Sequence, residues 1–136
     1  MDESANNREF WEWPIFDKYG MTQWSWRVIH PERLSFKNNL FVGSFSVIDA
    51  TVGVEIEENV QIGFGCQILS YSSVDHKSGK IILKKNCGIG SNSVIMPGIT
   101  VGEDAIVGAN SLVARDVPKN EVWAGTPARF LKKQLG

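Results

Sequence analysis

Five aliphatic residues recur at intervals of six along the second half of the chain: Ile89, Ile95, Val101, Val107 and Val113. A small residue, glycine or alanine, directly follows most of them, and a small or aliphatic residue comes four places after each. A helix repeats about every 3.6 residues and a strand every 2, so neither produces a period of six. The ladder therefore predicts a chain that turns a corner about every six residues.

The ladder continues upstream to Leu83, and a second one runs through Ile56, Ile62, Ile68 and Val74. The two are out of phase, because nine residues separate Val74 from Leu83, which predicts an insertion of three residues. The intervening segment 75–82 is mostly polar and contains a glycine, so we expect it to form a loop.

Three such hexads predict one coil with a triangular cross-section. Stacked coils then form parallel strands about 4.8 Å apart, with residues of similar size in inward-facing rows. The three predicted rows are Ile48, Cys66, Cys87 and Ala105, then Val54, Ser72, Ser93 and Ser111, then Val42, Val60, Ile99 and Val117. This arrangement places both cysteines in one row, where we expect reduced, structural thiols.

Composition excludes several classes of protein. The 136 residues carry a formal net charge of -1, which gives no sign of a nucleic-acid or membrane-surface binder. No apolar run approaches the roughly 20 residues of a membrane span, and the polar, acidic start of the chain is unlike a secretory signal, so we expect a cytoplasmic protein. Two cysteines are too few for a disulfide framework or a four-thiolate metal site.

The flanks of the repeat predict two capping segments. Residues 1–40 hold all but one of the five tryptophans and are expected to cap the first coil, before a repeat over 41–125. The alternative is that some of these aromatics line an acceptor pocket or a subunit contact. At the other end, Thr126 as N-cap and Pro127 at the first helical position predict a short helix over 126–136.

The run from Ile89 to Pro118, followed by Ala-Gly-Thr-Pro-Ala-Arg ending at Arg129, resembles the hexapeptide-repeat acyltransferases. It is similar to the galactoside and maltose acetyltransferases and to sugar acetyltransferases of surface-polysaccharide pathways. The resemblance implies an all-β fold, a left-handed parallel β-helix of about four coils, and acetyl-CoA as acyl donor. It also implies a homotrimer, which agrees with the thin core of a single subunit.

Acyl transfer from a thioester needs a base for the acceptor nucleophile and donors for the developing oxyanion. The resemblance implies that His76, in the inserted loop, is the general base and reaches the groove between neighbouring subunits. The alternative is a solvated loop histidine. His30, the other histidine, is expected to be structural, and Asp49, Glu57 and Glu58 are candidate carboxylates for orienting the base.

For coenzyme A, the resemblance implies a pantetheine arm that runs along the outside of the coils. The matching positions fall into three groups: Ser91 and Ala109 with backbone amides at the arm or thioester, Ala114 and Arg115 near the nucleotide, and Arg129 and Lys132 as cations for its phosphates. Each of these could instead belong to a solvated face.

The acceptor is less well defined. The galactoside branch has an acceptor-binding asparagine near Phe45, which this chain lacks, so Ser46 or Asp49 is expected to bind the acceptor. The branch also has a tryptophan where this chain has Gly88. Both departures favour a nucleotide-linked or lipid-linked sugar over a free simple sugar, by analogy alone.

Two alternatives use the same scaffold. The first is a gamma-type carbonic anhydrase, whose metal site resembles a three-histidine zinc site. This chain has two histidines, which cannot supply three ligand positions, so no metal is expected. A non-catalytic scaffold or binding protein remains an open alternative, although it needs neither a histidine-bearing loop nor a basic C-terminal segment.

Overall fold

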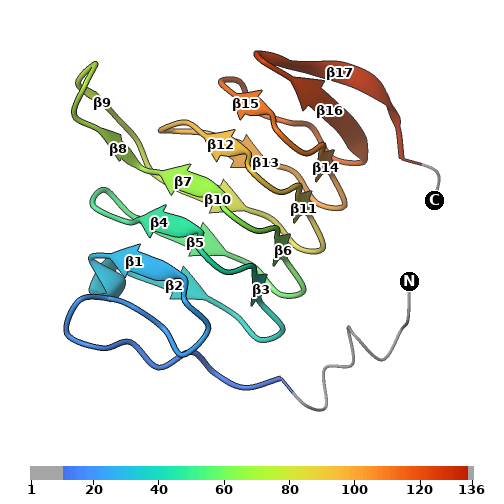
Figure 1. Ribbon diagram of the computed structural model, residues 1–136. Coiled ribbons are helices and arrows are strands. Elements are labelled where there is room, and N and C mark those ends of the chain that lie inside the picture. The colour runs from blue at the N-terminus through green and yellow to red at the C-terminus, as the bar shows by residue number, and fades with distance from the viewer. Residues whose placement is uncertain (1–10, 135–136) are drawn as a thin grey trace.

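The computed structural model describes residues 11–134, which form a parallel β-solenoid of about five turns (Figure 1). Three sheets make up its sides. The first sheet contains β1 (Arg27–Ile29), β4 (Val47–Asp49), β7 (Gln67–Leu69), β12 (Val94–Ile95) and β15 (Leu112–Val113). The second contains β2 (Leu34–Phe36), β5 (Val54–Ile56), β10 (Ile81–Leu83) and β13 (Thr100–Val101). The third contains β3 (Phe41–Val42), β6 (Gln61–Ile62), β11 (Gly88–Ile89), β14 (Ile106–Val107), β16 (Glu121–Gly125) and β17 (Ala128–Lys133).

The six-residue ladder is the inner wall of this solenoid. Apart from Val74, its aliphatic residues alternate among the three sheets and are all buried. One column contains Val28, Ile48, Ile68, Ile95 and Val113, and the column of the third sheet contains Val42, Ile62, Ile89 and Val107. The predicted all-β repeat is confirmed, with about five turns rather than four.

The predicted inward rows are wrong in the early coils, which are longer than three hexads, whereas the later steps from Cys87 to Ala105 and from Ser93 to Ser111 agree with the register. Ile48 pairs with Ile68, two positions beyond Cys66, and only later coils such as that from Ile95 to Val113 have the length of three hexads. The two additional residues belong to the side that leads from β4 to β5, which includes a turn with Gly53 at φ 112°.

This longer repeat separates the two cysteines into different columns. The register from Val47 through Gln67 to Val94 puts Cys66 level with Ser93 of the next coil. The register from Gln61 to Gly88 puts Cys87 level with Val60 instead. Both thiols are free and buried, and they do not share the row that the sequence predicted.

The insertion is larger than three residues and begins earlier. The coil from Ile68 to Ile95 is half as long again as the next coil, which runs from Ile95 to Val113. The additional length forms an antiparallel hairpin of β8 (Tyr71–Ser72) and β9 (Lys77–Ser78), which stands away from the coils (Figure 1). Val74 is not a rung of the ladder, because it lies in the hairpin turn and is 94% exposed.

Solenoid strands begin at Arg27, so the first coil lies inside the segment that was predicted as a cap. The aromatic residues before it pack on this coil, since the Phe16 and Trp26 rings are 6.0 Å apart and those of Trp13 and Phe36 are 5.5 Å apart. A single turn of 3-10 helix, η3 (Pro31–Arg33), joins β1 to β2. No helix within residues 11–134 has the length and apolar character needed to cross a membrane.

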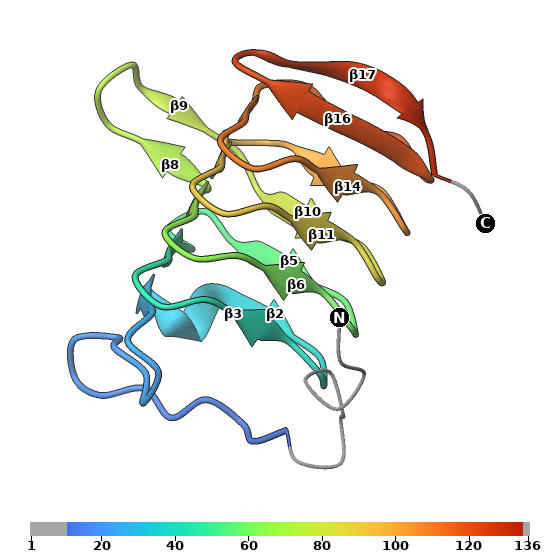
Figure 2. The ribbon, with the colours of Figure 1, turned by 45° about the vertical axis from the view of Figure 1, so that its right-hand side comes forward.

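The predicted C-terminal helix is wrong. The chain turns at Thr126 and Pro127 and returns as β17, which pairs antiparallel with β16 and extends the third sheet (Figure 2). An isolated helix of this length is marginal in water, whereas the edge of β16 offers a full set of backbone partners. Tertiary pairing therefore overrides the helix-start signal in the sequence.

Candidate functional site

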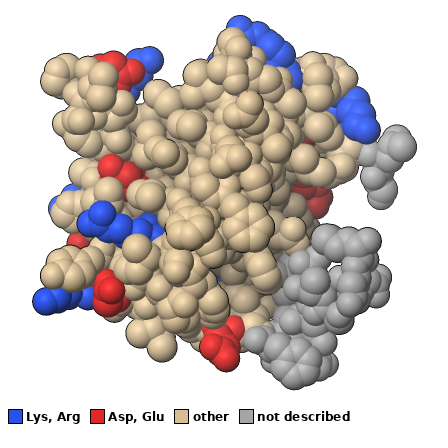
Figure 3. All heavy atoms as spheres, viewed as in Figure 1, with Lys and Arg blue, Asp and Glu red and all other residues tan. Residues whose placement is uncertain are grey.

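A groove of about 780 Å³ lies on the outer face of the third sheet. Its floor contains outward-facing residues of successive strands, among them Phe41, Gln61, Gly88 and Ile106. Trp11, Glu12 and Trp24 of the N-terminal segment also line it. The space-filling view shows a face of the molecule whose centre carries few charged side chains (Figure 3).

A column of glycines borders the groove at the corner that follows the third sheet. A Cβ on Gly90 would lie 2.4 Å from the Ala109 nitrogen, and one on Gly63 would lie 2.6 Å from the Ser91 nitrogen. Only glycine allows the coils to approach this closely. This explains why small residues follow the ladder positions of the sequence.

The same corner exposes unused backbone donors. The Ser91 carbonyl accepts a hydrogen bond from the Asn110 amide at 2.8 Å. The amide N–H groups of Ser91 and Ala109, however, donate to no other residue in the range 11–134. Unpaired backbone N–H groups require water or a ligand, so these two are available to a carbonyl oxygen.

His76 lies in the turn of the β8–β9 hairpin, with an exposed side chain and a left-handed backbone at φ 56°. The neighbouring Asp75 forms an ion pair with Lys77 at 3.6 Å. A hydrogen bond from the Ser72 hydroxyl, together with the charge of Lys77, lowers the pKa of Asp75. The hairpin thus carries an imidazole that solvent or another molecule can reach.

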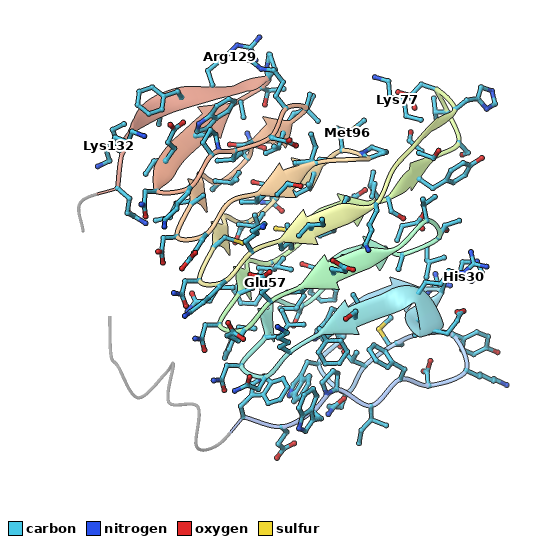
Figure 4. The ribbon with its side chains drawn as sticks, turned by 180° about the vertical axis from the view of Figure 1, so that it is seen from behind. His30, Glu57, Lys77, Met96, Arg129 and Lys132 are labelled. Atoms are coloured by element: carbon cyan, nitrogen blue, oxygen red, sulfur yellow. The ribbon has the colours of Figure 1, made fainter. Side chains whose placement is uncertain are left out.

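The hairpin does not lie beside the groove of its own chain. It leaves the solenoid between β7 of the first sheet and β10 of the second, whereas the groove lies on the third sheet. The view from behind places Lys77 of the hairpin and Lys132 of the third sheet on opposite sides of the molecule (Figure 4). One copy of the chain therefore does not bring His76 to the Ser91 and Ala109 amides.

The two residues predicted to bind the acceptor are occupied by internal contacts. The Ser46 hydroxyl is buried, donates to the Gly63 carbonyl at 2.8 Å and accepts from the Cys66 amide. A carboxylate oxygen of Asp49 accepts from the amide and hydroxyl of Thr51 in a turn. Both side chains hold the coil together at these positions.

Glu57, a candidate orienting carboxylate, and the second histidine also have local partners. Glu57 accepts a hydrogen bond from the Lys85 amide at 2.9 Å. His30 lies 3.1 Å from the Glu32 carboxylate beside η3. No group of three or more histidine, cysteine, aspartate or glutamate side chains suited to a metal ion occurs between residues 11 and 134.

Comparisons with known proteins agree with this architecture. The family model described as bacterial transferase hexapeptide (six repeats) matches residues 80–115. Galactoside O-acetyltransferase of Escherichia coli K12 is 30% identical over 135 residues, which cover 88% of this chain and 64% of that protein. A putative acetyltransferase of Bacillus subtilis 168 is 27% identical over 114 residues, which cover 82% of this chain and 66% of that protein.

Two solved structures give the same result. A hexapeptide-repeat acetyltransferase from Vibrio cholerae O1 biovar eltor, complexed with acetyl coenzyme A, superposes with a TM-score of 0.75 and 26% identity over 82% of this chain and 66% of that chain. A maltose O-acetyltransferase from Clostridium difficile 630 superposes with a TM-score of 0.73 and 27% identity, over 82% of this chain and 64% of that chain. This chain therefore contains the bacterial transferase hexapeptide repeat and is similar in sequence and fold to the hexapeptide-repeat acetyltransferases. It spans just under two thirds of the length of the first curated relatives that it matches.

In this hexapeptide-repeat protein, the residues predicted for the nucleotide end of coenzyme A lie on the last coils. Arg115 follows Ala114 after β15, and its guanidinium lies 5.4 Å from the centre of the Trp123 ring. Arg129 and Lys132 are exposed on β17 (Figure 4). The strand supplies these cations in place of the predicted helix.

Sequence reasoning about the repeat missed several groove residues. Phe41 and Phe64 were not singled out, because outward-facing positions of the coils carry no periodic signal, and Glu12 lies before the repeat. The clustering of tryptophans before the repeat was the available signal. That signal allowed either a cap on the first coil or a pocket. In the structure, Trp11 and Trp24 belong to the capping segment and also line the groove.

Proposed function

We propose that the chain transfers an acetyl group from acetyl-CoA to a hydroxyl or amino group of a sugar. His76 is the general base, and a homotrimer brings it to the groove of a neighbouring copy. The observation that carries this proposal is the separation of one chain's parts: unpaired amides beside the groove, and an exposed histidine on a remote hairpin. The structure of the Vibrio relative with acetyl coenzyme A supports the donor.

The proposed chemistry follows from these parts. The His76 imidazole takes the proton from the acceptor hydroxyl or amine, whose lone pair attacks the thioester carbonyl. The Ser91 or Ala109 amide donates to the oxyanion, and the carbon–sulfur bond then breaks. The proton returns from the imidazole to the coenzyme A sulfur, so that the base is regenerated.

The acceptor that we propose is a nucleotide-linked or lipid-linked sugar, as in surface-polysaccharide synthesis. Cations on the outside of the last coils, Arg115, Arg129 and Lys132, are available to phosphates of the donor. The relatives named as galactoside and maltose acetyltransferases support a sugar as the acceptor class.

The test compares two histidine variants, because both histidines have a left-handed backbone that asparagine also tolerates. Release of the coenzyme A thiol is measured from acetyl-CoA with methyl galactopyranoside, maltose, glucosamine and a nucleotide-linked hexose as acceptors. We expect His76→Asn to lower turnover by about 10²–10⁴-fold and His30→Asn to leave it unchanged. Equal turnover of the His76→Asn variant and the wild type would show that His76 is not the base.

A further inference from the structure

The groove is lined almost entirely by uncharged residues, which is unusual for a site beside a cofactor that carries several phosphates. Of its lining residues, all of which lie in the described part of the chain, Glu12 alone carries a charge, and none is a lysine or arginine. An anion placed here would lose solvation without gaining a cationic partner from the lining that one copy supplies. The groove therefore disfavours phosphate and carboxylate groups.

The aromatic walls are held in place before any ligand arrives. The Trp11 indole N–H donates to the Leu40 carbonyl at 2.6 Å, and its ring packs at 4.6 Å edge-on against Trp13. The Trp24 carbonyl accepts a hydrogen bond from the Ser44 hydroxyl at 3.1 Å. These contacts tie both indole-bearing segments to the first coils and present apolar surface to the groove.

The floor is open at Gly88. A Cβ added there would meet no other atom within 4 Å, in contrast to the tightly packed Gly63 and Gly90 beside it. Gly88 is also in the strand next to the corner that carries the Ser91 amide. A ring that lies across Gly88 therefore has one edge close to the amides that receive the thioester carbonyl.

We infer that this groove is the acceptor subsite and that it takes a sugar ring without negative charge. The apolar face of the ring packs against the indoles, and its hydroxyl or amino groups meet the Glu12 carboxylate and the Ser44 hydroxyl. Any phosphate of a carrier-linked acceptor lies outside the groove. This inference rests on the proposed function, and it limits which part of the acceptor enters the site.

The experiment uses saturation-transfer NMR on the wild-type protein with matched sugars. The probes are methyl glucopyranoside, methyl galactopyranoside and glucosamine, set against glucose 6-phosphate and galactose 6-phosphate. We expect an uncharged or amine-bearing sugar to bind about tenfold more tightly than the phosphorylated sugars. Glu12→Gln should reduce this difference in affinity between uncharged and phosphorylated sugars, because it removes the carboxylate that repels the phosphate.

Two tryptophan insertions locate the binding. Ile106→Trp enlarges an outward-facing side chain of the groove floor and should weaken sugar binding by about tenfold or more, whereas Thr100→Trp, on the outer face of the second sheet, should leave it unchanged. Circular dichroism and solution mass confirm that both variants keep the fold and the assembly.

Equal binding of phosphorylated sugars, no binding of any probe, or full binding by Ile106→Trp would each overturn the inference. Sugar binding that persists without turnover from acetyl-CoA would count against the proposed function alone, so the two failures are distinguishable.

Discussion

Individual residues at the coil corners adopt a left-handed backbone, and most of them are asparagine. Asn59, Asn86, Asn92, Asn110 and Asn120 all have φ near 60°. Asparagine tolerates this region better than other residues with a Cβ. Phe45 is the bulky exception, with φ 68° and a side chain that is 79% exposed.

Replacement of Phe45 should therefore relieve backbone strain. We expect Phe45→Asn to raise the free energy of unfolding by about 1 kcal/mol, since a left-handed conformation costs a bulky residue roughly 1–2 kcal/mol. Urea denaturation at fixed protein concentration measures the change. The reverse substitution at another corner, Asn92→Phe, should lower stability by a similar amount, and a loss of stability in Phe45→Asn would indicate that the aromatic ring is needed for a contact.

Cys87 predicts a specific loss of stability in alkali. Burial, with a smaller effect from the Glu57 carboxylate, raises the pKa of this thiol from 9.0 to about 12. A raised pKa in the folded state means that stability is full below pH about 9 and falls as the pH rises toward 12. Unfolding free energies from pH 8 to 11 should decline less steeply in Cys87→Ala than in the wild type, and parallel declines would contradict this.

At the scale of the elements, the glycine column decides how closely the coils stack. Gly90→Ala would place a Cβ against the Ala109 backbone, so we expect it to destabilise the fold by about 1–3 kcal/mol. Gly88→Ala is the matched control, because its Cβ enters open space. We expect the control to be neutral or stabilising by less than about 1 kcal/mol. Thermal or urea unfolding of both variants checks this, and equal effects would refute the packing argument.

The sequence predicted the inner wall well and the exceptions to it poorly. Rungs such as Ile89, Val101 and Val113 were identifiable because burial imposes one residue type at a fixed interval. The longer early coils were not, since a turn such as that at Gly53 adds residues without changing the aliphatic signal. Val74 has the right residue type and spacing for a rung but lies in the hairpin turn.

The candidate site was only partly predictable for the same reason. His76 and the amides of Ser91 and Ala109 were accessible through the resemblance, while the groove depends on contacts between the N-terminal segment and outward-facing residues. The local signal at Thr126 and Pro127 predicted a helix, because it contains no information about the free edge of β16.

For the whole molecule, the arrangement of groove and hairpin predicts an obligatory assembly. We expect light scattering to give the mass of a trimer, and specific activity to fall on dilution below the concentration at which the trimer dissociates. A monomeric mass with full activity would show that a single copy is sufficient.

Complementation between two inactive variants tests the shared site most directly. His76→Asn removes the base, and Ala109→Pro removes an unpaired amide N–H. Proline should fit there, because Pro97 holds the same position of the hexad at another corner, where it precedes Gly98 as Ala109 precedes Asn110. Each variant alone should lose about 10²-fold or more of its activity in the thiol-release assay while keeping its circular dichroism spectrum, since Ala109 is then the main donor to the oxyanion. The two variants are then unfolded and refolded together in equal amounts, so that trimers form at random. About a quarter of the sites should regain activity, namely those that combine an intact His76 from one copy with an intact Ala109 from its neighbour. A mixture that remains as inactive as its components would contradict a catalytic site formed between copies.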